Sequence, residues 1–202
     1  SLPPQPIHDS ASDFSSKKLL KNKQYLGFLA LLFFIIFALY LPQPLTQNFL
    51  QEERRLSLGQ IGSLGSLSAL GNVVLNLFLG QLGARTGFLL GQFSVALFAF
   101  LIWHGSGMEL FGLGYFLLGG FRSARSLAAA HVNSLVNDAQ MGLAYGLTET
   151  VSAFPLILAP PLAGYLYSTD PASPYPFSLL LIFVGIILTL IFFPRSTTQL
   201  PN

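Results

Sequence analysis

The chain contains no cysteine and few charged residues. Without cysteine it can form no disulfide, no thiolate metal site and no cysteine nucleophile. Charged residues make up 9% of the 202 residues, whereas a soluble domain carries about a quarter. The net charge of +2 argues against a nucleic-acid partner, which would require a concentrated basic face. Because 52% of the residues are hydrophobic, the expected surroundings are a lipid bilayer.

Motifs of an enzyme or of a metal site are also missing from the sequence. The histidines, His8, His104 and His131, are dispersed and lack the spacing of zinc ligands. There is no H-E-x-x-H motif and no recognisable nucleophile–base pair. We therefore expect no bound metal, no cofactor and no membrane-embedded enzyme.

Charged residues divide the sequence into six largely apolar blocks. A membrane-spanning helix needs roughly 20 mostly apolar residues, and the blocks have about that length. We predict an all-α membrane protein with a six-helix bundle in residues 17–195. Its spans are expected at about 24–50, 57–83, 88–104, 110–135, 142–167 and 177–193. Residues 1–16 are rich in Pro, Ser and Asp and should form a disordered linker or tail, and residues 196–202 a cytoplasmic tail. The missing initiator methionine indicates a piece of a longer chain.

Lysine and arginine predict which side of the membrane each connection occupies. Only two basic residues, Arg54 and Arg55, fall on the side opposite the N-terminal end, where Glu52 and Glu53 offset them. The basic residues of the other side are Lys17, Lys18, Lys21, Lys23, Arg85 and Arg195. Because cytoplasmic loops carry the excess of Lys and Arg, both termini are predicted to be cytoplasmic, in an inner or plasma membrane.

Polar side chains lie along one face of the second, fourth and fifth spans. They are Ser68, Asn72 and Asn76 in the second span, Arg122 and Arg125 in the fourth, and Glu149 in the fifth. Such residues avoid hydrocarbon, so they should face one another or a water-filled cavity. The third and sixth spans carry hardly any polar residue and are predicted to be peripheral. This division indicates two three-helix units.

Three stretches resemble motifs of the major facilitator superfamily of transporters. The sequence from Gly80 to Gly87, GQLGARTG, resembles the family's loop pattern G-x-L-x-D-R-x-G between the second and third spans of a half. Ala84 stands in the place of the acid. Gly119-Gly120-Phe121-Arg122 resembles the small residues before an arginine in the family's fourth span. Residues 142–167 resemble the Gly/Pro-rich fifth span that ends in P-P-L-A-G-x-L-Y. The leading PPQP…SSKK stretch resembles the central cytoplasmic linker.

The resemblance covers roughly residues 17–195 and implies the C-terminal six-helix half of such a transporter. It implies as partners an N-terminal six-helix half, in the same chain or separate, a small-molecule solute and the bilayer. The two halves would enclose a central cavity and rock against each other. The loop residues Gly80, Gly83, Arg85 and Gly87 would form either a tight turn with a positive anchor or a cytoplasmic latch on neighbouring helix ends.

The arginines of the fourth span require water or an anionic partner, since an arginine at mid-bilayer costs about 2.5–3.5 kcal/mol. Glu149 is the one intramembrane acid. Counted from the cytoplasmic ends of their spans, Arg125 and Glu149 differ in depth by about 4.5 Å, which an arginine side chain bridges. We predict this pair, either as a buried structural pair or with a role in substrate or proton coupling. Arg122 lies deeper, and its partner is either the N-terminal half or an anionic substrate.

Five further polar residues are candidates for the site, each with a structural alternative. His131 is either a proton relay or an interfacial residue with a solvated ring. Asn72 and Asn76 either line the cavity or form hydrogen bonds between helices. Gln43 and Gln47, which follow Pro42, either form an external gate or belong to a frayed span end.

The sequence thus predicts a secondary active transporter that moves a small solute by alternating access and is coupled to protons. An efflux permease would be one transporter of this kind. The alternative is a transport-inactive membrane scaffold or receptor of the same fold, which the missing acid at Ala84 favours slightly. A polar, water-accessible cavity around Arg122 would favour transport. A dry, fully paired core would favour the scaffold.

Overall fold

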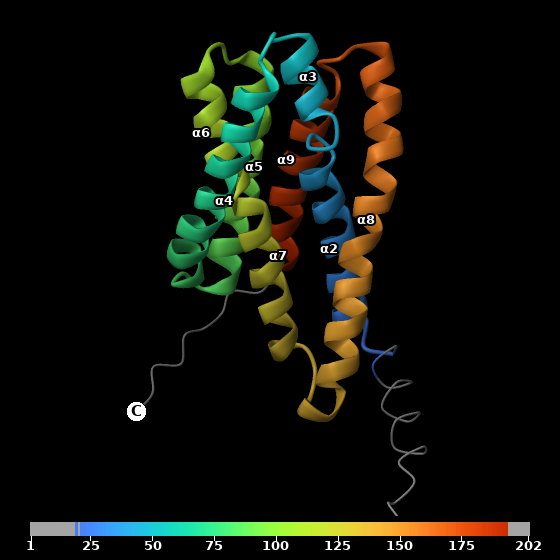
Figure 1. Ribbon diagram of the computed structural model, residues 1–202. Helices are drawn as coiled ribbons and strands as arrows, with labels where there is room; N and C mark the ends of the chain where they lie inside the picture. The colour runs from blue at the N-terminus through green and yellow to red at the C-terminus, as the bar shows by residue number, and fades with distance from the viewer. Residues whose placement is uncertain (1–18, 20, 194–202) are drawn as a thin grey trace, which may run out of the picture.

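A computed structural model of the chain describes residue 19 and residues 21–193, which form a bundle of helices (Figure 1). No strand occurs in these residues, as expected. The tails expected at 1–16 and 196–202 lie outside the described residues. The elements are α2 (Lys23–Tyr40), α3 (Thr46–Glu52), α4 (Leu58–Gly80), α5 (Ala84–His104), α6 (Met108–Leu118), α7 (Gly120–His131), α8 (Met141–Thr169) and α9 (Pro174–Phe192), with 3-10 turns at Val132–Ser134 and Asp138–Gln140.

Five of these helices are long and apolar enough to cross a membrane. They are α2, α4, α5, α8 with the 3-10 turn before it, and α9. The first residue of α2 and the last of α9 lie at the same end of the bundle (Figure 1). An even number of crossings is therefore implied, while the cytoplasmic identity of that end stays a prediction.

The first expected span, 24–50, is not one helix. α2 ends at Tyr40, and a turn leads into the short α3. Pro42 and Pro44 lie in this turn, and proline offers no backbone N–H to continue the hydrogen bonds of a helix. The start of α2 is fixed by Asn22, whose side chain accepts hydrogen bonds from two backbone N–H groups of the first turn.

The fourth expected span, 110–135, consists of α6 and α7, which are divided at Gly119. With 11 and 12 residues, neither helix is long enough to cross a membrane alone. Six crossings require that α6 and α7 cross together, and this stays a prediction. Gly119 keeps right-handed helical dihedral angles, φ −52° and ψ −28°. The division coincides with a close approach of α4, because a Cβ at Gly119 would lie 2.2 Å from the backbone nitrogen of Asn72.

The packing order shows two related three-helix units. α2 packs on α8, α4 packs on α6 and α7, and α5 packs on α9. The first helix of one unit therefore meets the second of the other, the second meets the first, and the third meets the third. This reciprocal pattern agrees with the division into two three-helix units that the sequence indicated.

The third span, α5, is not peripheral, and this prediction was wrong. Half of the residues in an apolar 18-residue segment of α5 are buried within the chain, against 17% for α4 and 22% for α8 with the preceding turn. Small residues let α5 and α7 approach closely: a Cβ at Gly91 would lie 2.9 Å from that of Ala124. The buried Gln92 also donates a hydrogen bond to Thr189 of α9.

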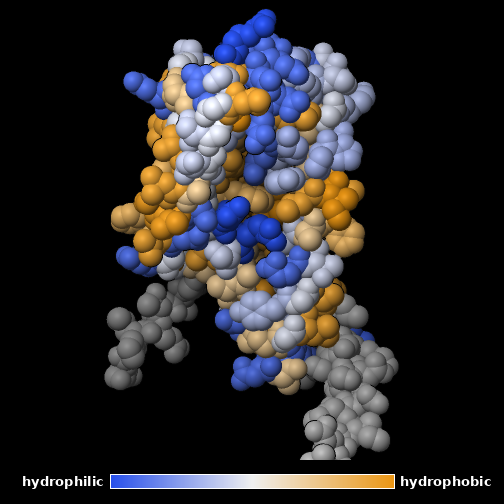
Figure 2. Space-filling view, viewed as in Figure 1, coloured by the Kyte–Doolittle hydropathy of each residue, from blue (hydrophilic) through white to orange (hydrophobic). Residues whose placement is uncertain are grey.

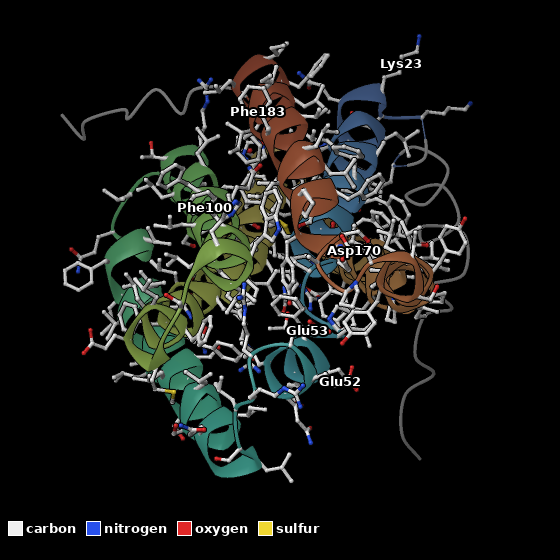
Figure 3. All side chains as sticks on the ribbon, turned by 90° about the horizontal axis from the view of Figure 1, so that it is seen from above. Lys23, Glu52, Glu53, Phe100, Asp170 and Phe183 are labelled. Carbon is white, nitrogen blue, oxygen red and sulfur yellow. The ribbon has the colours of Figure 1, made fainter. Side chains whose placement is uncertain are left out.

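The helices with polar stripes, α4, α7 and α8, lie on the side of the bundle that faces the viewer in Figure 1, which we call the open side. Seen from above, α4 and α9 lie on opposite sides, and Phe183 of α9 is on the side away from α4 (Figure 3). Phe183 is 65% exposed, as expected of a side chain that contacts lipid. α4 and α8, by contrast, expose the faces that carry Asn76 and Glu149. The open side is therefore the place to look for a site.

Candidate functional site

A small polar cavity lies between α4 and the junction of α6 with α7. Its volume is about 180 Å³. It is lined by Gln43, Gly65, Ser68, Ala69, Asn72, Leu118, Gly119, Phe121 and Arg122. In Figure 2, hydrophilic residues gather at mid-height over α7, with hydrophobic surface on both sides. Ser68 and Asn72 of α4 and the first arginine of α7 thus meet at one cavity.

Arg122 has no counter-charge in the part of the chain that the structure describes. Its side chain is exposed at the cavity, and no acidic residue described lies within ion-pair distance. The residues before it, Gly119 and Gly120, bring the start of α7 against α4 and α5: a Cβ at Gly120 would lie 1.9 Å from the hydroxyl of Ser94. Close packing of small residues therefore positions the guanidinium beside the α4 stripe.

The four amides proposed as cavity lining divide into two groups. Gln43 and Asn72 line the cavity, whereas Asn76 and Gln47 do not. Asn76 instead donates a hydrogen bond of 2.8 Å to the side-chain oxygen of Asn72, and so orients it. Gln47 lies exposed on α3. Gln43 donates to the carbonyl of Leu39 at 2.8 Å, which holds its side chain at the end of α2.

Arg125 and Glu149 form the predicted ion pair. The guanidinium Nη2 donates to the Glu149 carboxylate at 3.0 Å, from α7 to α8. The side chains are 27% and 60% exposed in the described bundle, which speaks against the alternative of a buried structural pair. From the loop that joins them, α7 and α8 separate toward the other end of the bundle (Figure 1), so neither helix covers much of the pair.

A second polar bridge, which the sequence analysis missed, joins α8 to the 3-10 turn Val132–Ser134 that follows α7. The hydroxyl of Tyr145 on α8 donates to the side-chain oxygen of Asn133 at 2.6 Å. Tyr145 and Glu149 are four residues apart, so they share one face of α8. That spacing beside Glu149 was the signal in the sequence. Two side-chain bridges therefore connect α8 to this part of the chain, one to α7 and one to the 3-10 turn after it.

His131 belongs to the packed interior, and the expected solvated ring was wrong. The side chain is 9% exposed and stacks on Phe193 with a centroid distance of 4.1 Å. Phe28 lies at 5.4 Å on another side, and Nδ1 is 3.2 Å from the Ser134 hydroxyl. The ring borders an apolar groove of about 690 Å³, which α2 and α9 line together. It does not line the cavity that holds Arg122.

The loop motif between α4 and α5 forms a tight turn with one long-range contact. Gly80 ends α4, and Gly83 precedes the first residue of α5. A Cβ at Gly87 would lie 2.7 Å from the carbonyl oxygen of Leu79, so the close approach of the two helices needs a glycine there. Arg85 donates a hydrogen bond of 2.6 Å to the carbonyl of Leu190 in the last turn of α9. The arginine therefore holds a helix C-terminus within this bundle.

An arginine at the opposite end of the bundle makes an equivalent contact. Arg54, in the turn after α3, donates a hydrogen bond of 2.5 Å to the carbonyl of Trp103 near the end of α5. Its guanidinium also lies 5.2 Å from the ring centre of Phe49. Each end of the bundle therefore has one arginine that binds the carbonyl end of a neighbouring helix.

Comparison with known proteins was consistent with this architecture. The family model described as Major Facilitator Superfamily matches residues 26–202. Over 119 residues the chain is 31% identical to a probable peptide/nitrate transporter of Arabidopsis thaliana. That match covers 57% of this chain but only 24% of the relative, so the chain spans about a quarter of the relative's length.

Proposed function

Because this chain belongs to the Major Facilitator Superfamily, we propose that it is part of a secondary transporter that carries a small polar solute across a membrane by alternating access. The described bundle would act as one of two halves that rock against each other, its open side turned toward the other half. The N-terminal end and the end of α9 would face the cytoplasm of an inner or plasma membrane.

The observation that carries this proposal is the cavity at Arg122, an arginine for which the described part of the chain provides no counter-charge. An arginine in an apolar span is costly, and it is normally placed where it meets water, a counter-charge or a transported solute. The cavity of about 180 Å³ at Arg122 is also lined by the polar side chains of Ser68 and Asn72. A transport-inactive scaffold would gain nothing from leaving this charge uncompensated.

Glu149 is the residue that we assign to proton coupling. Glu149 is an acidic residue within the apolar stretch of α8, and its side chain is 60% exposed. Its partner among the described residues is Arg125. A proton on the carboxylate would remove its charge and release Arg125 from the pair. Protonation would then favour one arrangement of α7 and α8 over another, which is the requirement for coupling. His131, which packs against Phe28 and Phe193 away from the cavity, has no part in this step.

The test is solute-driven proton movement in the complete protein. Liposomes that hold the purified protein and a trapped pH-sensitive dye are given nitrate or dialanine, which the name of the plant relative suggests as probes. We expect one of them to change the internal pH in protein-containing liposomes and not in empty ones. Radiolabelled exchange of the same probe across the membrane is then measured without a pH gradient.

Glu149→Gln separates coupling from transport. In this variant we expect exchange to continue while accumulation driven by a pH gradient is lost. Thr150→Ser, an exposed change at the next residue, serves as the control and should leave both activities unchanged. Accumulation by Glu149→Gln at the wild-type level would remove Glu149 from the coupling step. A folded wild-type protein that moves neither probe nor any other solute would support the scaffold.

A further inference from the structure

We propose that the cavity beside Arg122 binds an anionic oxygen group, a carboxylate or an oxoanion, at one end of the solute. This names the substrate class of the transporter proposed above and rests on that function. Arg122 lines the cavity and makes no ion pair in the residues that the structure describes. A cationic solute would be repelled by the guanidinium. An acidic residue of the other half is the competing partner, and in that case the complete protein would give no anion response that depends on Arg122 in the test below.

Arg122 and Arg125 differ in whether the described residues provide a counter-charge. Both arginines belong to α7, three residues apart. Arg125 is neutralised within the chain by Glu149 at 3.0 Å. Arg122 sits one turn earlier, at the cavity, where the described lining contains no acidic residue. One arginine of the helix is therefore compensated, and the other is available to a ligand.

The other polar groups of the cavity also favour an acceptor ligand. The side-chain oxygen of Asn72 already accepts a hydrogen bond from Asn76, so its amide N–H groups remain for the cavity. The Ser68 hydroxyl makes no hydrogen bond with a described residue and can donate to a ligand. A guanidinium offers paired N–H donors that match two oxygens of a carboxylate or a nitrate. All three side chains can thus donate to the same anionic group.

The size of the cavity fits one group of a solute and not a whole one. Its volume of about 180 Å³ is smaller than that of a typical ligand pocket, roughly 300–1,000 Å³. Gly65 and Gly119 lie in its wall and keep it free of side chains at those positions. The cavity is therefore a subsite for the charged end, and the rest of the solute lies outside it on the open side of the bundle.

Anion binding is tested on the complete protein in neutral detergent, without any measurement of transport. The melting temperature is followed against acetate, as the carboxylate probe, and nitrate, as the oxoanion probe, with sodium chloride at equal ionic strength as the reference. We expect a saturable rise with at least one of the two probes and none with choline chloride or glucose. Which probe acts tells which anionic group the subsite prefers.

Two variants connect the effect to this cavity. Arg122→Gln should weaken the apparent affinity for the active probe by about tenfold to one hundredfold, the usual effect of losing a hydrogen bond to a charged group. Arg55→Gln removes the same charge from an exposed turn and should bind like the wild type. Asn72→Asp keeps an oxygen for Asn76 but replaces the free donor by a negative charge, and should abolish binding. It tests the proposal even if Arg122→Gln does not fold.

Equal responses to acetate, nitrate and chloride in the wild type would overturn the proposal. So would wild-type binding by both Arg122→Gln and Asn72→Asp. Either result would leave the proposed transport standing, because the assay does not depend on it. Conversely, saturable binding that the variants abolish, together with no solute movement in liposomes, would keep the anion subsite and overturn the transport function.

Discussion

Arg125 and Glu149 join α7 to α8 at 3.0 Å, although the Glu149 side chain remains 60% exposed. The described bundle leaves one side of this ion pair uncovered, and in the proposed transporter that side faces the aqueous pathway between the two halves. The contribution of the pair to stability is therefore that of a surface pair, about 0.2–1 kcal/mol, and not the 3–5 kcal/mol that follows the loss of one partner of a buried pair.

A double-mutant cycle measures this contribution. We expect Arg125→Gln and Glu149→Gln each to lower the free energy of unfolding slightly, and the double variant to recover about 0.2–1 kcal/mol relative to the sum. Stability is measured by thermal or denaturant unfolding of the four proteins in the same detergent. Strict additivity would show that the two side chains do not interact in solution, and a coupling above 3 kcal/mol would show that the pair is buried.

Gly71 is predicted to be the least replaceable glycine of α4. A Cβ there would lie 1.9 Å from the carbonyl oxygen of Phe116, a backbone atom that moves only with α6. Gly62, on the same helix, has nothing within 4 Å of the same position. Alanine improves helix propensity by up to about 1 kcal/mol at both sites. We therefore expect Gly71→Ala to be less stable than Gly62→Ala by about 1–3 kcal/mol, the usual cost of overpacking. Equal melting temperatures would contradict the close approach of α4 and α6.

Arg85 and Arg54 are predicted to protect two different helix ends. Arg85→Ala removes the donor to Leu190 and should speed amide hydrogen exchange in the last turn of α9. Arg54→Ala removes the donor to Trp103 and should do the same at the end of α5. Contacts of this kind contribute about 0.3–1 kcal/mol, which corresponds to roughly twofold to fivefold in exchange rate. Each variant is the control for the other, and a uniform increase in both helix ends would refute the assignment.

The chain's lack of cysteine allows a direct test of sidedness. Single cysteines at Gln81, Ser106 and Asp170 would occupy exposed turns in a chain that is otherwise free of cysteine. If the α2 start is cytoplasmic, a membrane-impermeant maleimide added to intact cells should label positions 106 and 170. Position 81 should react only after the membrane is opened. Labelling of position 81 in intact cells would reverse the predicted orientation.

The sequence alone determined the helical framework and one of the contacts of the site. Uncharged blocks of about 20 residues predicted helices because a backbone in hydrocarbon must satisfy its own hydrogen bonds. Counting helical rise from the span ends predicted that Arg125 and Glu149 meet, since depth along a helix follows directly from residue number. The proline pair after Tyr40 signalled a disturbed helix end, and the structure places the boundary between α2 and α3 there.

Only the tertiary structure decided which faces of the helices are covered. An apolar side chain such as Phe98 of α5 is equally suited to lipid and to a protein neighbour, so hydropathy did not reveal that α5 is packed. The burial of His131 depends on Phe28 and Phe193, which come from helices distant in sequence. The choice of Asn72 over Asn76 as cavity lining depends on where the junction at Gly119 presses against α4. These features arise from contacts between segments, and the periodicity of a single helix carries no information about the neighbour it will meet.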